Sequence, residues 1–451
     1  MRRITLQLLA VSSLTLLLGA AQARTRPHYG DALRADTQTV VMSGDKSPEV
    51  LSGLVFENLV TIDNSGHLQP GLATSWSSAN SGSHWEFALR QNLTFHDGTP
   101  LKPADVVRCL SKASAQSWRV RAASDGIVIE SDTPLPNLPA IFSLPEFAIY
   151  FDGPEGALGT GPYRLDKRTG PLFSLRANDD YWAGRPFLDG VELLTSRSQR
   201  DQLNDFLLER AEVVELAPEN WRRAQQERMR TASSKPIQLI YLAIDSATPA
   251  LRDPRLSQAI SLCIDRGAIQ SVIFQHQGEI AASLLPNWLS GYAFLFDANQ
   301  DISRARQLRG QLGPLPSLVI SYDPNDPEGR LIAERVALNA HDAGINLQPQ
   351  PNGAHADIRV RSANVASLSP SAALAGLIDQ LGPKAPIPGA NAQSLYDSER
   401  AALETYSAIP LVFVPRVTAL RDRVRNWADS PSGAWQFESV WLARPRTETT
   451  R

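Results

Sequence analysis

Apolar and polar positions follow two different periods along this chain. A short apolar run at 39–42 and strict alternation at 85–89 predict strands, and clusters of Asn, Asp, Gly and Pro bound the second one. Between the two, apolar residues recur at helical spacing from Val50 to Leu59, which predicts a helix. The stretch 363–393 is rich in Ala, Ser, Pro and Gly and predicts helix fragments and loops. The pattern is that of a mixed α/β protein.

Other segments carry clear helix signals. Pro103 and Asp105 open one helix, because proline is tolerated in the first turn and an acid there is favoured by the helix dipole. Single apolar stripes predict helices at 253–264 and 331–343. The segment 318–322, just before the second stripe, has the pattern of a strand.

The first residues have the three parts of an export signal. Arg2 and Arg3 precede a mostly apolar run at 6–18, and small residues follow at 21–23. The run is shorter than the about 20 residues that a helix needs to cross a membrane, so we expect a cleaved signal peptide at 1–23. No cysteine follows the small residues, so we expect a soluble periplasmic protein that is not a lipoprotein.

Length, charge and cysteine content narrow the classes of function. The chain has 451 residues, more than the roughly 250–300 that one core supports, so two lobes are expected. Its formal net charge is -3, and no basic block is long enough to follow a phosphate backbone, which argues against a nucleic acid partner. Cys109 and Cys263 lie in apolar helical patterns. We expect two buried thiols, although one disulfide also fits the count.

Motifs for catalysis or metal binding are missing from the sequence. It has neither the Gly-x-Ser-x-Gly turn of serine hydrolases nor a Walker phosphate loop. Its histidines are scattered, without the spacing that places two imidazoles on one helix face. We expect His96, beside an Asp-Gly turn, to form a hydrogen bond rather than to bind a metal. The sequence therefore predicts no cofactor, no metal and no enzymatic activity.

Short segments rich in Gly, Pro and aromatic residues occur in a characteristic order along the chain. In the first half they are 56–63 (FENLVTID), 70–76 (PGLATSW), 95–107 (FHDGTPLKPADVV), 159–163 (GTGPY) and 178–191 (NDDYWAGRPFLDGV). In the second half they are 251–260 (LRDPRLSQAI), 264–269 (IDRGAI) and, more weakly, 409–413 and 440–442. Together they resemble the bacterial extracellular solute-binding proteins of the oligopeptide, dipeptide and nickel class, family 5, of which this chain is a shortened member.

The resemblance implies an α/β fold with two lobes. It is the Venus-flytrap architecture of type II periplasmic binding proteins, in the peptide-binding class with a subdivided first lobe. We expect lobe I at 24–240, with an inserted subdomain at about 60–158, and completed by about 415–451. We expect lobe II at 241–414. The resemblance also implies that a ligand is enclosed between the lobes by a hinge motion.

The chain departs from the family pattern at one functionally important segment. Peptide-binding members carry a Trp and an Asp-Tyr-Pro-Asp-like phrase, whose acid pairs with the α-ammonium of the peptide. This chain has the sequence ADIRVRSANV at 356–365 instead. An unpaired buried ion costs several kcal/mol, so three outcomes stay open. Another acid, such as Asp245 or Asp357, takes the role; the ligand lacks an ammonium; or the site is lost.

Four residues are candidates for ligand binding because they lie in segments similar to those that line the family's cleft. They are Tyr241, Asp245, Trp288 and Tyr292. Each also has a purely structural interpretation, in which Tyr241 belongs to the core of a strand and Asp245 caps a turn. In that interpretation the other two residues fill space within the lobe.

The resemblance implies a function in transport. The expected protein is the substrate-binding component of an ABC-type importer and acts as a monomer. It binds peptides or a peptide-like solute and delivers them to ABC permease subunits in the inner membrane, with backbone contacts that all peptides share. Two alternatives use the same fold: a ligand-sensing or regulatory binding protein, and a nickel- or metallophore-binding protein.

Overall fold

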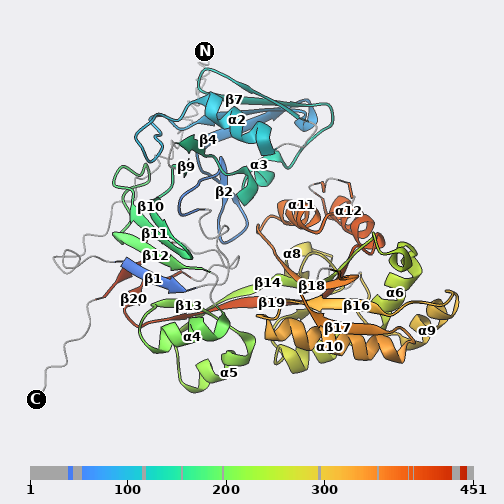
Figure 1. Cartoon of the computed structure of the whole chain (residues 1–451). Helices are drawn as coiled ribbons and strands as arrows, with labels where there is room; N and C mark the ends of the chain where they lie inside the picture. Colours follow the sequence, from blue (N-terminus) through green and yellow to red (C-terminus); the bar gives the residue numbers. More distant parts are fainter. Residues whose placement is uncertain are drawn as a thin grey trace, which may run out of the picture. The chain divides into compact units, whose positions relative to one another are not determined.

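Figure 1 shows the computed structural model of the chain. The structure describes residues 39–43, 53–113, 118–153, 156–195, 198–292, 296–352, 355–383, 385–386, 388–389, 391–428 and 437–443. The predicted signal peptide at 1–23 lies outside these residues.

The largest sheet in the described part of the chain is mixed and has 11 strands. Ten of them follow the order β10-β11-β12-β1-β13-β19-β14-β18-β16-β17, and β15 pairs with β19. In chain order the strands are β1 (Thr39–Ser43), β10 (Tyr163–Thr169), β11 (Leu172–Ala177), β12 (Gly190–Leu194), β13 (Val213–Leu216), β14 (Thr231–Ile244), β15 (Glu279–Ile280), β16 (Leu318–Tyr322), β17 (Leu347–Pro351), β18 (Ile358–Asn364) and β19 (Ala408–Leu420).

Two long strands connect the two halves of this sheet. β19 pairs with β13 through Val417 to Leu420 and with β14 along nearly its whole length, whereas β14 pairs with β18 only from Gln238 onward. Between these parts Pro236 lies opposite Pro415, and the register shifts on both sides of that pair. Prolines lack the amide hydrogen that strand pairing needs, so the hydrogen bonds between β14 and β19 are interrupted here. We call this point, where both strands pass from the first half of the sheet to the second, the strand crossing.

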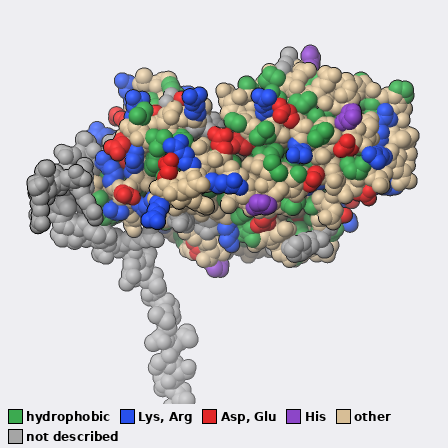
Figure 2. All heavy atoms as spheres, turned by 90° about the horizontal axis from the view of Figure 1, so that it is seen from below, with side chains coloured by type: hydrophobic (Ala, Val, Ile, Leu, Met, Phe, Trp, Pro, Cys, Tyr) green, Lys and Arg blue, Asp and Glu red, His purple; other side chains and the backbone are tan. Residues whose placement is uncertain are grey.

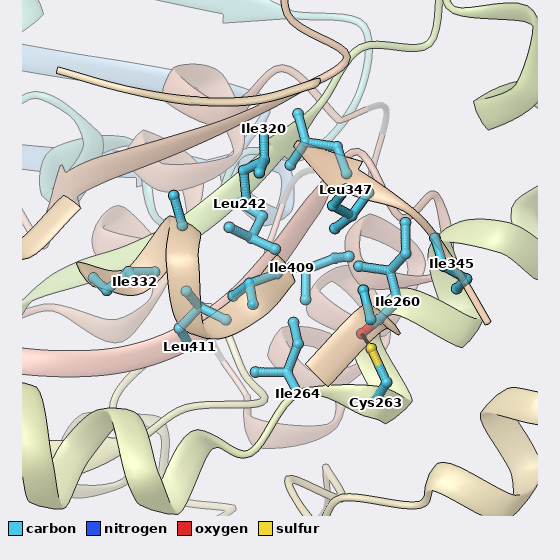
Figure 3. Close-up of a cluster of buried hydrophobic side chains, with 14 of the residues drawn as sticks. Leu242, Ile260, Cys263, Ile264, Ile320, Ile332, Ile345, Leu347, Ile409 and Leu411 are labelled. Atoms are coloured by element: carbon cyan, nitrogen blue, oxygen red, sulfur yellow. Dashed lines mark hydrogen bonds between the residues drawn. The ribbon is translucent and has the colours of Figure 1, made fainter. Parts of the chain in front are cut away.

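Helices cover both faces of the second half of the sheet. The side chains of β14 alternate, so Leu242 joins one apolar cluster and Tyr241 joins another on the opposite face. Figure 3 shows the first cluster, in which Leu242 lies with Ile320 and Ile332. That cluster is closed by α6 (Pro254–Cys263), α9 (Ile302–Gly310) and α10 (Pro327–Asp342), and α7 (Arg266–Ala268) follows α6. The opposite face carries α8 (Asn287–Ser290), α11 (Pro370–Leu381) and α12 (Ala392–Glu404), which Figure 1 shows across the strands from α10.

The first half of the sheet is covered by α4 (Gln199–Leu207) and α5 (Pro218–Gln226), whose Phe206 and Trp221 pack beside β13. A short pair of strands, β20 (Val424–Arg425) and β21 (Trp441–Leu442), adds Val424 and Leu442 to a further apolar cluster with β11 and β12. Residues after β19 therefore pack with strands from the first part of the chain.

A separate sheet has the order β4-β5-β7-β6. Its strands are β4 (Ala73–Ala79), β5 (His84–Leu89), β6 (Trp118–Ala122) and β7 (Gly126–Ser131), and they pack with α2 (Pro103–Ala113) and α3 (Leu138–Ile141) around Phe87, Leu110 and Phe142. The small pairs β2 (Val60–Ile62) with β3 (Leu68–Pro70) and β8 (Phe151–Gly153) with β9 (Gly156–Leu158) lie in the same part of the chain. The residue boundaries that we predict for the lobes and the subdomain remain a proposal.

The elements with strong local signals form as predicted. β5, α2, α6, β16 and α10 all lie where the sequence places them. Their ends have local causes, since the carboxylate of Asp253 caps α6 and that of Asp326 caps α10. The stretch predicted as helix fragments and loops contains the last part of β18, all of α11 and the start of α12.

The helix predicted from Val50 to Leu59 is wrong for the part that the structure describes. Residues 53–55 form a turn, and the backbone of Glu57 pairs with that of Ile149. The carbonyls of Leu54 and Val55 accept hydrogen bonds from the amides of residues 163 and 161, about a hundred positions away. Tertiary hydrogen bonds thus use the groups that a helix would have paired internally.

Both cysteines, Cys109 and Cys263, are buried thiols that are not joined in a disulfide, as expected. Burial raises the pKa of the Cys263 thiol to about 12. Among the described residues, no helix combines the length and apolar character needed to span a membrane. On the face shown in Figure 2, acidic and basic side chains are interspersed over the surface.

Candidate functional site

Three of the four predicted binding residues lie in one apolar cluster. Tyr241 on β14 is 8% exposed, and the partly buried rings of Trp288 and Tyr292 pack against the same cluster. Burial raises the pKa of the Tyr241 phenol, while the neighbouring Arg361 acts in the opposite direction. The structure therefore brings these aromatic residues together on one face of the second half of the sheet.

Trp288 lies at the strand crossing, where β14 and β19 run side by side from the first half of the sheet to the second. It belongs to α8, a single turn that starts after Pro286 and ends at Gly291, whose φ of 74° favours glycine. The indole Nε1 donates a hydrogen bond to the carbonyl of Pro236 at 3.0 Å. The ammonium of Lys235 lies 4.7 Å from the centroid of the Trp288 ring, within the range of a cation–π contact.

Tyr292 is held by a buried carboxylate that the sequence does not reveal. Its hydroxyl donates to Oε2 of Glu399 on α12, and the amides of Leu284 and Leu285 both donate to Oε1 of the same residue, the latter at 2.7 Å. Glu399 is 0% exposed, and burial raises its pKa to about 7 even though these three donors favour the charged form. Through these three hydrogen bonds, Glu399 connects α12 to the segment that contains Trp288 and Tyr292.

A sequence signal for Glu399 does exist. Leu395, Glu399 and Ala402 recur at helical spacing, so an acid occupies the apolar face of α12. Such an acid needs partners in the core. The stretch 363–393 predicts only helix fragments and loops, and α12 begins inside it. The sequence pattern therefore does not predict α12 as one complete helix with Glu399 on its apolar face.

Asp245 lies apart from Trp288, although only four residues separate it from Tyr241 along the chain. It follows the end of β14, where its amide donates to the carbonyl of Asp357 at 2.9 Å and its Oδ1 accepts from the amide of Ala247 at 2.9 Å. At about 3.3 Å per residue, the path along β14 from Pro236 to Asp245 is roughly 30 Å. Asp245 therefore belongs to a different site from Trp288.

The second acid considered as a substitute, Asp357, has both carboxylate oxygens engaged. Oδ1 accepts from the hydroxyl of Thr248 and Oδ2 from the amide of Val319, each at 2.7 Å. These bonds connect the turn after β14 to β16. Asp357 therefore has a clear structural role in this part of the sheet.

The segment 356–365, which replaces the family's acidic phrase, is followed by several residues with hydroxyl groups. The amide of Val365 donates to the carbonyl of Ile237 at 2.9 Å, which places this segment beside the strand crossing. Ser367 is buried, and its Oγ accepts from the amide of Ser369 at 3.1 Å. The hydroxyls of Ser369 and Ser371 lie 3.2 Å apart. Neutral hydrogen-bonding groups therefore follow this segment beside the strand crossing.

Three of the sequence motifs meet at one carboxylate in the first half of the structure. Glu57 accepts hydrogen bonds from the hydroxyl of Thr160 at 2.7 Å, the hydroxyl of Tyr181 at 2.9 Å and the indole of Trp182 at 3.0 Å. Burial raises the pKa of Glu57 to about 7. The guanidinium of Arg90 lies 3.9 Å from the centroid of the Trp182 ring. The sequence motifs give no indication of this shared partner.

The predicted hydrogen-bonding role of His96 is confirmed. Its Nε2 lies 3.1 Å from the carbonyl of Gly161, and burial lowers the pKa of the imidazole. Among the described residues, no three His, Cys, Asp or Glu side chains are arranged to hold a metal ion.

The mixed sheet, its two crossing strands and the helices on both faces define the two-lobed α/β fold of periplasmic solute-binding proteins. The chain belongs to the bacterial extracellular solute-binding proteins, family 5, whose middle part matches residues 67–372. The expected family and fold class are thus confirmed.

Two curated relatives illustrate the range of similarity. The probable ABC transporter periplasmic-binding protein SapA of Escherichia coli (strain K12) is 29% identical over 137 residues, which are 29% of this chain and 24% of that protein. The probable di/tripeptide-binding protein 5 of Pseudomonas aeruginosa (strain UCBPP-PA14) is 26% identical over 347 residues, 65% of each chain. The matches therefore span from a quarter to just under two thirds of these relatives.

A solved structure shows the likeness of the fold. NikA from Staphylococcus aureus, in complex with Ni(L-His)2, superposes with a TM-score of 0.76 at 16% identity and covers 90% of this chain and 100% of its own. At this identity the likeness concerns the fold alone.

Proposed function

We propose that this protein is the periplasmic substrate-binding component of an ABC-type importer. In this proposal it binds a peptide or a peptide-like solute between its lobes and delivers it to a membrane permease. Its role is binding rather than catalysis, and export by the predicted signal peptide brings it to the periplasm. Membership of family 5 and the similarity to a probable di/tripeptide-binding protein support this role.

The observation that carries the proposal is the position of Trp288 at the strand crossing. The ring is fixed through Pro236, beside the bulged and proline-containing stretch that β14 and β19 share. A stretch with shifted register and missing amides is suited to act as a hinge. A ligand that contacts Trp288 and the nearby Ser367 to Ser371 hydroxyls would couple binding to bending at the crossing.

The first experiment is a thermal-shift screen of the purified protein with di- to octapeptides, amino acids, sugars and nickel complexes. A ligand that binds only the folded state raises the midpoint of unfolding. We expect a reproducible rise with peptides or peptide-like compounds. A rise with nickel–histidine complexes alone would reassign the ligand within the same fold. An unchanged unfolding midpoint with every class of compound would contradict the binding role.

Two matched tryptophan variants test the site. Trp288→Phe and Trp221→Phe each remove an indole hydrogen bond to a backbone carbonyl, that of Pro236 or that of Leu216. We expect at least about tenfold weaker binding, about 1.4 kcal/mol, only for the first variant. Titration calorimetry with the best ligand of the screen measures this difference. Equal affinities of the two variants would place the ligand elsewhere.

The sensing alternative differs in the partner rather than in the ligand. A regulatory binding protein would give the same thermal shift but would not support uptake. Uptake of the labelled ligand by cells with and without the gene therefore separates import from sensing. Unchanged uptake would favour the regulatory role.

A further inference from the structure

A cavity of about 230 Å³ lies at the end of β14, in the part of the chain that contains Asp245. Its lining includes the side chains of Asp245, Thr248, His355 and Arg359. Drug-sized ligands occupy roughly 300–1,000 Å³, so this cavity suits a smaller solute. It is roughly 30 Å from the Trp288 crossing along β14, and the function proposed above makes no use of it.

The walls of the cavity are fixed by hydrogen bonds. Asp357 accepts from the hydroxyl of Thr248 and from the amide of Val319, and its carbonyl accepts from the amide of Asp245. The carboxylate of Asp245 is itself oriented by the amide of Ala247. The carboxylate of Asp245 and the hydroxyl of Thr248 therefore start from defined positions, which lowers the entropic cost of binding.

The cavity lining carries three charged side chains, of which Asp357 is held by hydrogen bonds, while Asp245 and Arg359 form a long ion pair with each other. Nη1 of Arg359 lies 3.7 Å from Oδ2 of Asp245, beyond the usual range of a charged hydrogen bond. The two side chains keep 32% and 36% of their surface exposed. Each can therefore take a partner from solution without leaving a buried charge unpaired.

We propose that this cavity binds a small zwitterion, of which a free α-amino acid is the simplest case. The ammonium of the ligand pairs with Asp245, and its carboxylate pairs with the guanidinium of Arg359, next to the Thr248 hydroxyl. A simple cation would meet the repulsion of Arg359, and a simple anion that of Asp245. A solute that carries both charged groups on one carbon atom complements both side chains. The site is separate from the proposed peptide site.

The test uses three small probes that differ in the charged groups they carry. L-alanine has both an ammonium and a carboxylate, propionate has only the carboxylate, and ethylamine has only the ammonium. Saturation-transfer NMR on the purified protein detects weak binding of each one. We expect a signal for L-alanine at millimolar concentration and at least tenfold weaker binding of the two single-charge probes. Asp245→Asn, which keeps an oxygen for the Ala247 amide, and Arg359→Gln should each weaken L-alanine binding at least tenfold.

A control variant separates this site from the peptide site. Trp288→Phe should bind L-alanine as the wild type does, even where it loses the ligand of the thermal-shift screen. The proposal is overturned if L-alanine gives no saturation transfer, if propionate or ethylamine binds equally well, or if the Asp245 and Arg359 variants bind L-alanine normally. Unchanged circular dichroism of the variants ensures that a loss reports on the cavity and not on folding.

Discussion

At the scale of single residues, the glycines of the motif at 159–163 act where two backbones approach closely. A Cβ atom on Gly159 would lie 1.8 Å from the carbonyl oxygen of Val55, and one on Gly161 would lie 2.6 Å from that of Leu54. These glycines let the segment 159–163 pair with the turn at 53–55. The pairing brings Thr160 to Glu57. Glycine is required here by space rather than by backbone angles.

We predict that Gly159→Ala destabilises the protein strongly. The added methyl group must displace the Val55 backbone, and overpacking of this kind costs about 1–3 kcal/mol or more. Urea unfolding followed by circular dichroism measures the change. Gly310→Ala, at the end of α9, is the control because a Cβ there meets nothing within 4 Å. That substitution should be neutral or slightly stabilising, and equal losses for both would refute the steric argument.

At the scale of elements, the binding residues depend on how one segment is attached to one helix. Glu399 on α12 receives two amides and the hydroxyl of Tyr292 from the segment that contains α8. Burial raises the pKa of this carboxyl to about 7. In the unfolded chain the same group titrates near its ordinary value of 4.5. The folded state therefore holds the proton more tightly than the unfolded state.

This difference predicts a pH dependence of stability. Below pH 4.5 both states are protonated, and the stability contribution of Glu399 is fully present. As the pH rises from 4.5 to about 7 the unfolded state loses its proton first, so the free energy of unfolding falls, by about 3 kcal/mol from this group. Glu399→Gln should remove that part of the fall. Unfolding free energies at pH 5 and pH 8 measure it.

The control for this prediction lies on the same helix. The side chain of Glu404 is 70% exposed and lies 3.7 Å from Arg400. Glu404→Gln should leave the difference between pH 5 and pH 8 as it is in the wild type. Glu57 and Glu328, whose pKa values burial also raises, continue to contribute in both variants. Identical pH profiles of Glu399→Gln and the wild type would show that the carboxylate is ionised throughout.

At the scale of the whole molecule, β19 is the strand on which the second lobe depends. It pairs with β14 and β15, and it contributes Leu411 and Phe413 to the clusters on opposite faces of the sheet. Both clusters are built from residues between Ile237 and Val414. Ile237 and Leu239 lie just before the proposed start of lobe II at 241, and the boundary itself remains a proposal.

We predict that the fragment 231–420, which contains β14 and β19 complete, folds on its own. Its thermal unfolding should be cooperative when followed by circular dichroism. The fragment 231–404 lacks β19 and should show no cooperative transition, because both apolar clusters lose the buried side chains that β19 contributes. A cooperative transition in the shorter fragment would mean that β19 is dispensable. Failure of the longer fragment would mean that lobe II depends on the rest of the chain.

Much of the fold was predictable from local signals. The caps at Asp253 and Asp326 and the single apolar stripes that follow them locate α6 and α10. Periodicity failed where the competing partner was distant, as at Leu54, Val55 and Glu57, whose backbone groups pair with residues about a hundred positions away. The three aromatic candidates meet in one cluster, but nothing local indicates that Trp288 lies at Pro236, at the far end of β14 from Asp245.

The sequence by itself determined the family through the resemblance of its ordered motifs. It also determined the α/β class and the helices with strong caps, because capping and periodicity act over a few residues. Only the tertiary structure decided that Glu399 holds Tyr292, that Glu57 joins three motifs and that Asp245 faces Arg359. The physical reason is that hydrogen bonds and charge pairs depend on distances in space, and here most of them join residues about a hundred positions apart in the chain.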